Sequence, residues 1–154
     1  MPSLDKPAHE IEVFKKFVAE SGLPIDAATI ENREPDEPDI RCVHDTDGPI
    51  AFELVQLTSP EIAKNVGDQI KRGAKPELNW TADPTEAAIR GKISKKYETD
   101  CPIELLCYTR WTVSLDDSIL EMIERITSDQ GLGPFRRIWL LGEEVCCVAA
   151  ESHR

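Results

Sequence analysis

The sequence lacks the features that mark membrane-spanning and exported proteins. No apolar run approaches the roughly 18 residues that a membrane-spanning helix needs. The opening residues, MPSLDKPAHE, contain no apolar segment of the kind found in secretory signals. We therefore expect a cytoplasmic protein without a membrane partner.

Cysteine and histidine motifs are also missing. No two cysteines have the C-x-x-C spacing of a structural zinc site. Most of the five lie inside apolar runs, so we expect reduced thiols packed in the core. The three histidines do not pair with any plausible serine or cysteine nucleophile. These observations argue against zinc and disulfide scaffolds and against triad hydrolases.

Positive charge is scarce, and the net charge is −11. Residues 1–70 carry 6 Lys and Arg against 15 Asp and Glu, and residues 111–154 carry 4 against 8. Only residues 71–110 have an excess of basic residues, 8 against 6. A tight nucleic-acid binder normally shows a basic footprint. We therefore expect at most weak contact with nucleic acid, made through this basic segment.

What is present is a pattern of alternating helices and strands. The chain of 154 residues, 40% hydrophobic, is long enough for one core, which predicts a single domain over residues 1–154. Apolar periodicity and cap signals predict helices at about 8–21, from Ser59 onward, from Asp83 to about Tyr97, and at 115–126. Strands are predicted at 27–35, 38–44, 49–58 and 101–109, and RRIWLLG and EEVCCVA predict a terminal hairpin. This order is an αβββαβ core followed by a helix and two strands. It predicts an α/β or α+β fold with a central mixed sheet of five or six strands and helices on both faces.

Two acids flank the predicted turn at Asp47-Gly48. Asp39 follows Pro38 at the start of the second strand, and Glu53 lies inside the apolar third strand. An aspartate-glycine pair is a strong hairpin signal. Residues on the same face of paired strands lie about 5 Å apart, so these carboxylates should meet at one edge of the sheet. Such a pair can share a divalent cation.

Each acid also has a purely structural interpretation. Asp39 could cap backbone groups in a Pro-Asp turn. Glu53, flanked by apolar residues, needs a cation or an arginine if it is buried, and Arg41 or Arg33 could supply a salt bridge. Glu10, on the first predicted helix, borders the apolar face and is either a first-turn acid or an inward-leaning site residue.

The order helix, meander, helix, strand, with Pro38-Asp39 and Glu53 in these positions, resembles the PD-(D/E)xK nuclease-like superfamily, which has the restriction-endonuclease-like fold. The runs KISKKYETDCPIELLCYTRW and FRRIWLLG look like the later strands of that fold. The resemblance implies a phosphodiesterase site dependent on Mg²⁺ or Mn²⁺. It implies that Asp39 and Glu53 bind the metal and that Glu10 matches the helix acid of many members.

The sequence departs from this pattern at the motif lysine. Val55 stands two residues after Glu53, where the family places the lysine that positions or polarises the attacking water. Gln56, one residue further, should point to the opposite face and could serve only if the strand bulges. Lys64, on the helix predicted after Ser59, could bring a charge into the site, as the migrated lysine of some members does.

Two hypotheses of different class therefore stand. The first is a metal-dependent endonuclease-like hydrolase in which Asp39 and Glu53 act with Gln56 or Lys64. The second is a catalytically inactive member of the same fold that serves as an interaction or scaffold module, with a homodimer through the terminal hairpin as one form. Retention of the three acids favours the first, and Val55 together with the acidic charge favours the second.

Overall fold

The structure is a computed structural model that describes residues 6–57, 73, 84–109 and 116–151. Its elements, in chain order, are α1 (Lys6–Ser21), β1 (Ile25–Asn32), β2 (Ile40–His44), β3 (Gly48–Gln56), α3 (Pro84–Ser94), β4 (Ile103–Tyr108), α4 (Asp116–Gln130), β5 (Phe135–Leu141) and β6 (Val145–Ala150). Each predicted element in the described ranges is present. The helix predicted from Ser59 onward lies outside them.

The six strands form one mixed sheet whose spatial order follows the chain, β1 to β6. β1, β2 and β3 are an antiparallel meander. β3, β4 and β5 run parallel, and β6 returns antiparallel to β5. β4 is buried along its whole length, as expected for a strand between two parallel neighbours. This confirms the prediction of a central mixed sheet in an α+β domain.

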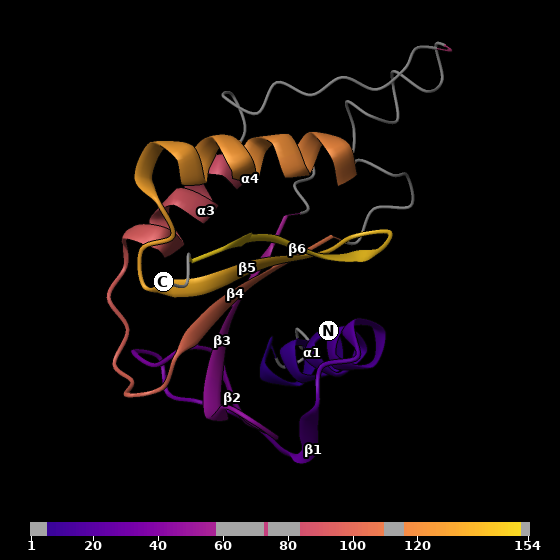
Figure 1. The fold of residues 1–154 in the computed structure, drawn as a ribbon, viewed down its shortest axis with the longest axis vertical. Coiled ribbons are helices and arrows are strands. Elements are labelled where there is room, and N and C mark those ends of the chain that lie inside the picture. The colour runs from indigo at the N-terminus through magenta and orange to yellow at the C-terminus, as the bar shows by residue number, and fades with distance from the viewer. Residues whose placement is uncertain (1–5, 58–72, 74–83, 110–115, 152–154) are drawn as a thin grey trace.

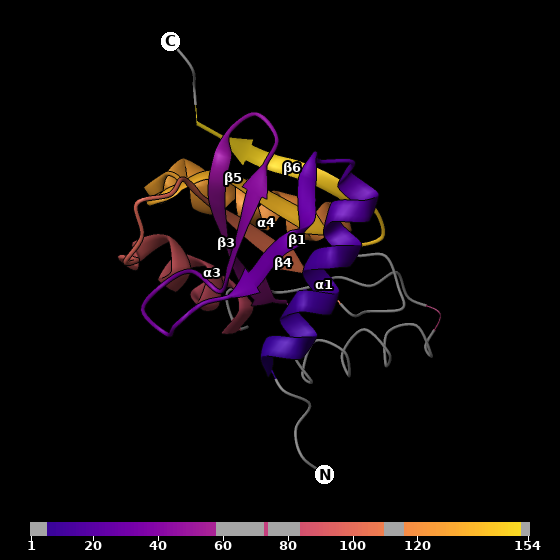
Figure 2. The same cartoon turned by 90° about the horizontal axis from the view of Figure 1, so that it is seen from below.

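Helices cover both faces of the sheet (Figures 1 and 2). On one face Phe14 and Phe17 of α1 pack against Phe52 of β3, with ring centroids 4.8 and 5.7 Å apart. On the other face α3 and α4 contribute Ile89, Ile93, Ile119, Met122, Ile123 and Ile126 to a separate apolar core. Within the described ranges, no helix has the length and apolar character needed to cross a membrane.

The turn between β2 and β3 forms as the Asp47-Gly48 pair predicts. Gly48 has a φ of +75°, which a residue with a side chain rarely adopts. The Nδ1 atom of His44 accepts hydrogen bonds from the backbone N–H groups of Thr46 and Asp47, both 3.1 Å long. The turn fixes the register, which pairs Ile40 with Phe52. Register and turn together determine which residues of β2 and β3 face each other.

Candidate functional site: an acid cluster with a lysine

Asp39 and Glu53 lie next to each other at the start of β2 and within β3. The register that pairs Ile40 with Phe52 puts Asp39 opposite Glu53. Oε1 of Glu53 accepts a hydrogen bond from the backbone N–H of Asp39 at 3.0 Å, and Oδ2 of Asp39 accepts one from the N–H of Leu54 at 2.9 Å. Each carboxylate is therefore held by the backbone of the opposing strand.

Lys92, in the last turn of α3, completes the site. Its Nζ lies 2.8 Å from Oε2 of Glu53, and the two side chains are 29% and 3% exposed. Strand alternation explains the meeting, because Glu53 shares its face of β3 with Val55, which packs in the core beneath α3 and α4. The Tyr97 hydroxyl donates a hydrogen bond to the Lys92 carbonyl at 3.3 Å, which anchors the end of α3. Burial raises the pKa of Tyr97, so its hydroxyl stays protonated.

Glu10 adds a third carboxylate from α1, where it is buried. We call Glu10, Asp39 and Glu53 the acid cluster. Burial is the main cause that raises the pKa of each member above its ordinary value. Mutual repulsion adds to this, because the charge of Asp39 raises the pKa of Glu53 and the charge of Glu10 raises that of Asp39. Lys92 and the charge of the exposed Lys6 act in the opposite direction without cancelling the effect of burial.

A second buried glutamate shows what a balanced cluster looks like in the same sheet. Glu104 of β4 is 1% exposed. Its Oε2 accepts from Arg136 Nε at 2.7 Å and from Arg137 at 3.0 Å, and its Oε1 accepts from the indole N–H of Trp139 at 2.6 Å. Arg136 also reaches Asp47 at 2.8 Å. This Glu104 network joins two acids to two arginines, so its formal charges balance.

The acid cluster is not balanced in this way. Among the described residues, Lys92 pairs with Glu53, and the charge of Lys6 acts on Glu10, so the three carboxylates and two lysines carry a formal charge of −1 when all are ionised. Buried carboxylates without enough positive charge are costly, and a structural role does not require such an excess. The cluster is therefore a candidate for binding a cation, whereas the Glu104 network is a structural ion-pair network.

The donor chemistry of the acid cluster fits a hard divalent cation. Mg²⁺ in proteins is commonly held by one or two carboxylates, with water and substrate phosphate in the remaining positions. Asp39 and Glu53 provide that number, and Glu10 lies beside them. Among the residues that the structure describes, no group of three His, Cys, Asp or Glu side chains is arranged as a ready-made metal site. Two carboxylates plus water and phosphate is therefore the arrangement that these residues fit.

The other predicted site residues lie elsewhere. Gln56 points to the face of β3 opposite to Glu53, and its Oε1 accepts from the Tyr108 hydroxyl at 3.3 Å. Arg33 pairs with Glu31 and Glu37 rather than with Glu53. Lys64 falls in the part of the chain that the structure does not describe.

Sequence reasoning missed Lys92, the cation in contact with Glu53. The residue was visible only as one of several basic positions on the helix AAIRGKISKKY, a pattern typical of a solvated face. Its spacing, however, distinguished it from the other basic residues of this helix. Lys92 precedes the apolar Ile93 and follows Ile89 by three residues, which places it at the border of the buried stripe.

Comparisons with protein-family models, with curated proteins and with solved structures found no match to this chain.

Proposed function

We propose that this protein is a divalent-cation-dependent phosphodiesterase of the restriction-endonuclease-like fold that acts on nucleic acid. The observation that carries the proposal is the contact of Glu53 with Lys92, 2.8 Å apart, beside the half-buried Asp39 and the buried Glu10. Carboxylates that can hold a metal ion, with an amine that can contact the water or the phosphate, form a set that is able to hydrolyse a phosphodiester. The αβββ order of α1 to β3, followed by α3 and the parallel strand β4, agrees with that fold.

The residues divide the chemistry between them. Asp39 and Glu53 would hold Mg²⁺ or Mn²⁺, which would lower the pKa of a bound water and neutralise charge on the phosphate. Lys92 reaches the same glutamate from α3, so its Nζ can donate to the attacking water or to a phosphate oxygen in the place of the lysine that Val55 replaces. Glu10 contributes negative charge that strengthens attraction for the cation.

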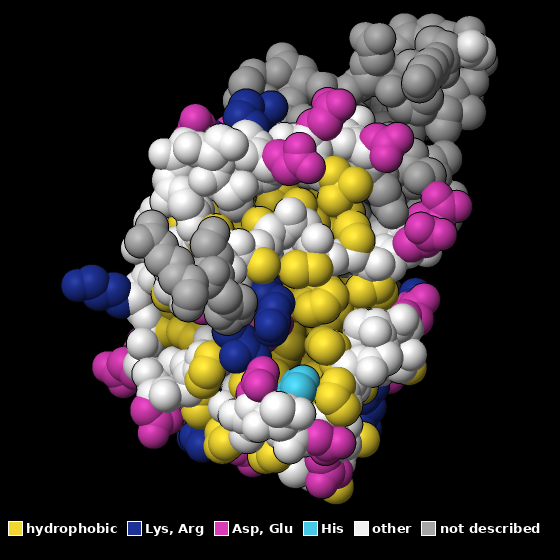
Figure 3. All heavy atoms as spheres, viewed as in Figure 1, with side chains coloured by type: hydrophobic (Ala, Val, Ile, Leu, Met, Phe, Trp, Pro, Cys, Tyr) yellow, Lys and Arg dark blue, Asp and Glu magenta, His cyan; other side chains and the backbone are white. Residues whose placement is uncertain are grey.

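On the face shown in Figure 3, Lys and Arg side chains gather near the centre beside apolar groups, while acidic side chains lie mainly around the periphery. On this face, attraction for a phosphate backbone should be strongest near the centre. We expect weak, strongly salt-dependent binding of nucleic acid.

Metal binding is the first test. Mn²⁺ is titrated by calorimetry into the wild type, into Glu53→Ala and into Glu104→Ala as a buried-glutamate control, with circular dichroism used to confirm that each variant is folded. We expect heat of binding for the wild type, none for Glu53→Ala, and wild-type binding for Glu104→Ala if that variant folds. Equal heats for the wild type and Glu53→Ala, or none for either, would remove the metal site.

Catalysis is the second test. Nicking of a supercoiled plasmid is followed in Mg²⁺ or Mn²⁺ with the wild type, with Asp39→Ala and with EDTA. We expect nicking by the wild type alone. Metal binding without nicking by the wild type would instead support the catalytically inactive interaction module, the alternative that the buried, apolar Val55 favours.

A further inference from the structure

The loop that follows α3 carries Tyr97, whose ring is held on several sides. The ring packs against Phe135 of β5, with ring centroids 5.7 Å apart and a tilt of 52°. The amine of Lys95 lies 5.0 Å from the centroid of the same ring. The side chain also packs on the apolar core to which α3 and α4 contribute. The fold therefore determines where the Tyr97 hydroxyl lies.

The Tyr97 hydroxyl is close to both ends of the Lys92 side chain. It donates a hydrogen bond to the main-chain oxygen of Lys92 at 3.3 Å, where that side chain begins. At the other end, Nζ of Lys92 lies 2.8 Å from Oε2 of Glu53. Burial raises the pKa of Tyr97 most, and the charge of Glu53 and a hydrogen bond with Glu53 raise it further. The hydroxyl is therefore within reach of the Lys92 carbonyl and of the carboxylate that the Lys92 amine contacts.

The carbonyl of Lys92 is one of those that need a partner from outside the helix. The last four carbonyl groups of a helix have no acceptor role within it, and Lys92 is the third residue from the end of α3. Its oxygen accepts hydrogen bonds from Tyr97 and from the N–H of Lys95, each 3.3 Å long. A lysine side chain is long and flexible, so holding its amine in one place costs entropy. Contacts at both ends of the side chain reduce the number of positions that the amine can adopt.

We infer that Tyr97 is a positioning residue for Lys92, whose hydroxyl fixes the end of α3 and keeps the Lys92 amine directed at the acid cluster. The inference rests on the proposed function, in which this amine donates to the attacking water or to a phosphate oxygen. Tyr97 acts through Lys92 and takes no part in the chemistry. A displacement of about 1 Å at a reacting group can slow a reaction about 100-fold, so such a contact affects the rate.

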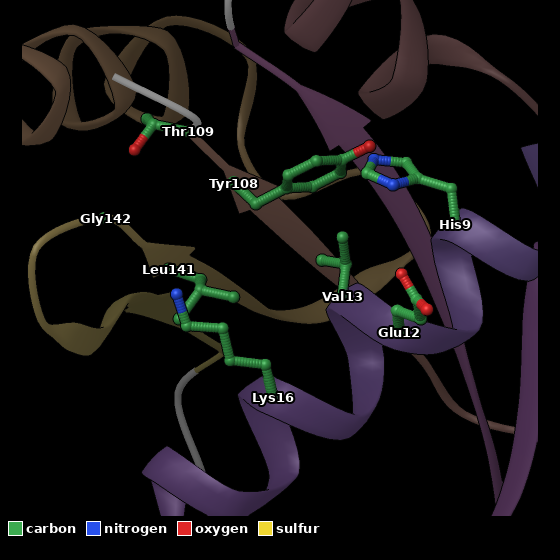
Figure 4. Close-up of a pocket in the computed structure, with 8 residues that line it drawn as sticks. All are labelled: His9, Glu12, Val13, Lys16, Tyr108, Thr109, Leu141 and Gly142. Carbon is green, nitrogen blue, oxygen red and sulfur yellow. The ribbon is translucent and has the colours of Figure 1, made fainter. Parts of the chain in front are cut away.

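Tyr108 offers a matched control, because it is the only other tyrosine in the chain. Its hydroxyl also donates a hydrogen bond of 3.3 Å, to Oε1 of Gln56. Its ring lies beside His9 of α1, on the face of the sheet opposite to α3 (Figure 4). Tyr97→Phe and Tyr108→Phe therefore each remove one hydroxyl and keep the ring, but only the first change removes a contact with Lys92.

The first experiment observes Lys92 directly, in EDTA and without substrate. The methylene group next to the amine is followed by ¹³C NMR, with its signal assigned from Lys92→Met, and urea unfolding confirms that each tyrosine variant is folded. We expect the signal to move toward those of exposed lysines in Tyr97→Phe and to keep its wild-type position in Tyr108→Phe. A signal that is unchanged in Tyr97→Phe, or that moves equally in both variants, would overturn the inference whether or not the protein binds a metal.

The second experiment measures plasmid nicking in Mg²⁺. Tyr97→Phe should lower kcat about tenfold, the effect of about one hydrogen bond, with KM for the plasmid unchanged and Tyr108→Phe at the wild-type rate. Because Tyr97 acts through Lys92, the double variant of Tyr97→Phe with Lys92→Met should be no slower than Lys92→Met alone. Losses that multiply in the double variant would show that Tyr97 acts independently of Lys92 and would overturn the inference.

Failure of the inference and failure of the proposed function are read separately. Mn²⁺ calorimetry and plasmid nicking by the wild type test the function without any change at Tyr97. A wild type that binds Mn²⁺ and nicks DNA, with the Lys92 signal unaffected by Tyr97→Phe, would keep the function and lose the positioning role. A wild type that neither binds Mn²⁺ nor nicks DNA would lose the function, and Tyr97 would then be a structural anchor only.

Discussion

Glu53 and Glu104 are equally buried on neighbouring strands, yet we expect opposite results when each is replaced by glutamine. Glu104 accepts three hydrogen bonds, two of them from arginines. An amide in its place leaves Arg136 and Arg137 with a weaker acceptor and uncompensated charge. Breaking a buried ion pair from one side costs about 3 to 5 kcal/mol. Glu104→Gln should therefore lower the free energy of unfolding by about 3 kcal/mol.

Glu53→Gln should leave the metal-free protein as stable as the wild type or more stable. The raised pKa of Glu53 means that its charged form is disfavoured in the folded state, by burial and by the charge of Asp39. The amide retains an oxygen for the N–H of Asp39 and removes that charge. Lys92 loses its partner, but its partly exposed amine can turn to water.

The assay is urea unfolding at pH 8 in EDTA, with free energies extrapolated to water. The ranking Glu53→Gln at or above wild type, with Glu104→Gln well below, is the expected result. Similar losses for both variants would refute the reasoning, because the acid cluster would then be a structural ion-pair network like that around Glu104. A loss confined to Glu53→Gln would refute it more strongly.

The raised pKa of Glu53 also predicts how stability changes with pH. Between the ordinary pKa of glutamate and the raised value of Glu53, the folded state binds more protons than the unfolded state, so stability falls as pH rises. The amide cannot titrate. The stability of Glu53→Gln relative to the wild type should therefore increase from pH 4.5 to pH 8 in EDTA. A difference that is constant or decreases over this range would contradict the raised pKa.

Two further predictions concern α3. Lys92→Met should reduce plasmid nicking at least about 100-fold, while its Mn²⁺ affinity in calorimetry stays near that of the wild type. Lys96→Met is the control at an exposed lysine. An unchanged nicking rate in Lys92→Met would exclude Lys92 from the reaction. Gly133→Ala should lower the free energy of unfolding in urea by about 2 kcal/mol more than Gly22→Ala does. Both glycines have positive φ. A Cβ at Gly133 would lie 2.1 Å from the Ile93 carbonyl oxygen, whereas a Cβ at Gly22 would have nothing within 4 Å. Equal losses would show that the loop before β5 does not press on the end of α3.

The mixed sheet and the pairing of the two strand acids could be predicted because their signals are local. The Asp47-Gly48 turn and a glutamate inside the apolar run of β3 are each visible within a few residues, and together they set Asp39 opposite Glu53. The burial of β4 was predicted for the same reason, from one continuous apolar run.

Partners brought together by packing could not be predicted in the same way. Lys92 is 39 residues from Glu53 in the chain and meets it only because α3 lies over β3. The Glu104 network depends on the register between β4 and β5, which places the arginines of FRRIW beside a glutamate some 30 residues earlier. A charged residue within an apolar run could have drawn attention to Glu104. Its arginine partners depended on the order of the strands in the sheet.

The sequential order of the strands also has a consequence for how the chain folds. Asp39 and Glu53 are 14 residues apart and meet through a hairpin, whereas the contact with Lys92 spans 39 residues. Short loops close before long ones, so the hairpin should bring the two carboxylates together before α3 delivers the amine. Repulsion between the acids would then slow this early step, and stopped-flow refolding of Glu53→Gln should be faster than that of the wild type at pH 8. The two carboxylates that we propose bind a cation would thus also influence how fast the hairpin forms.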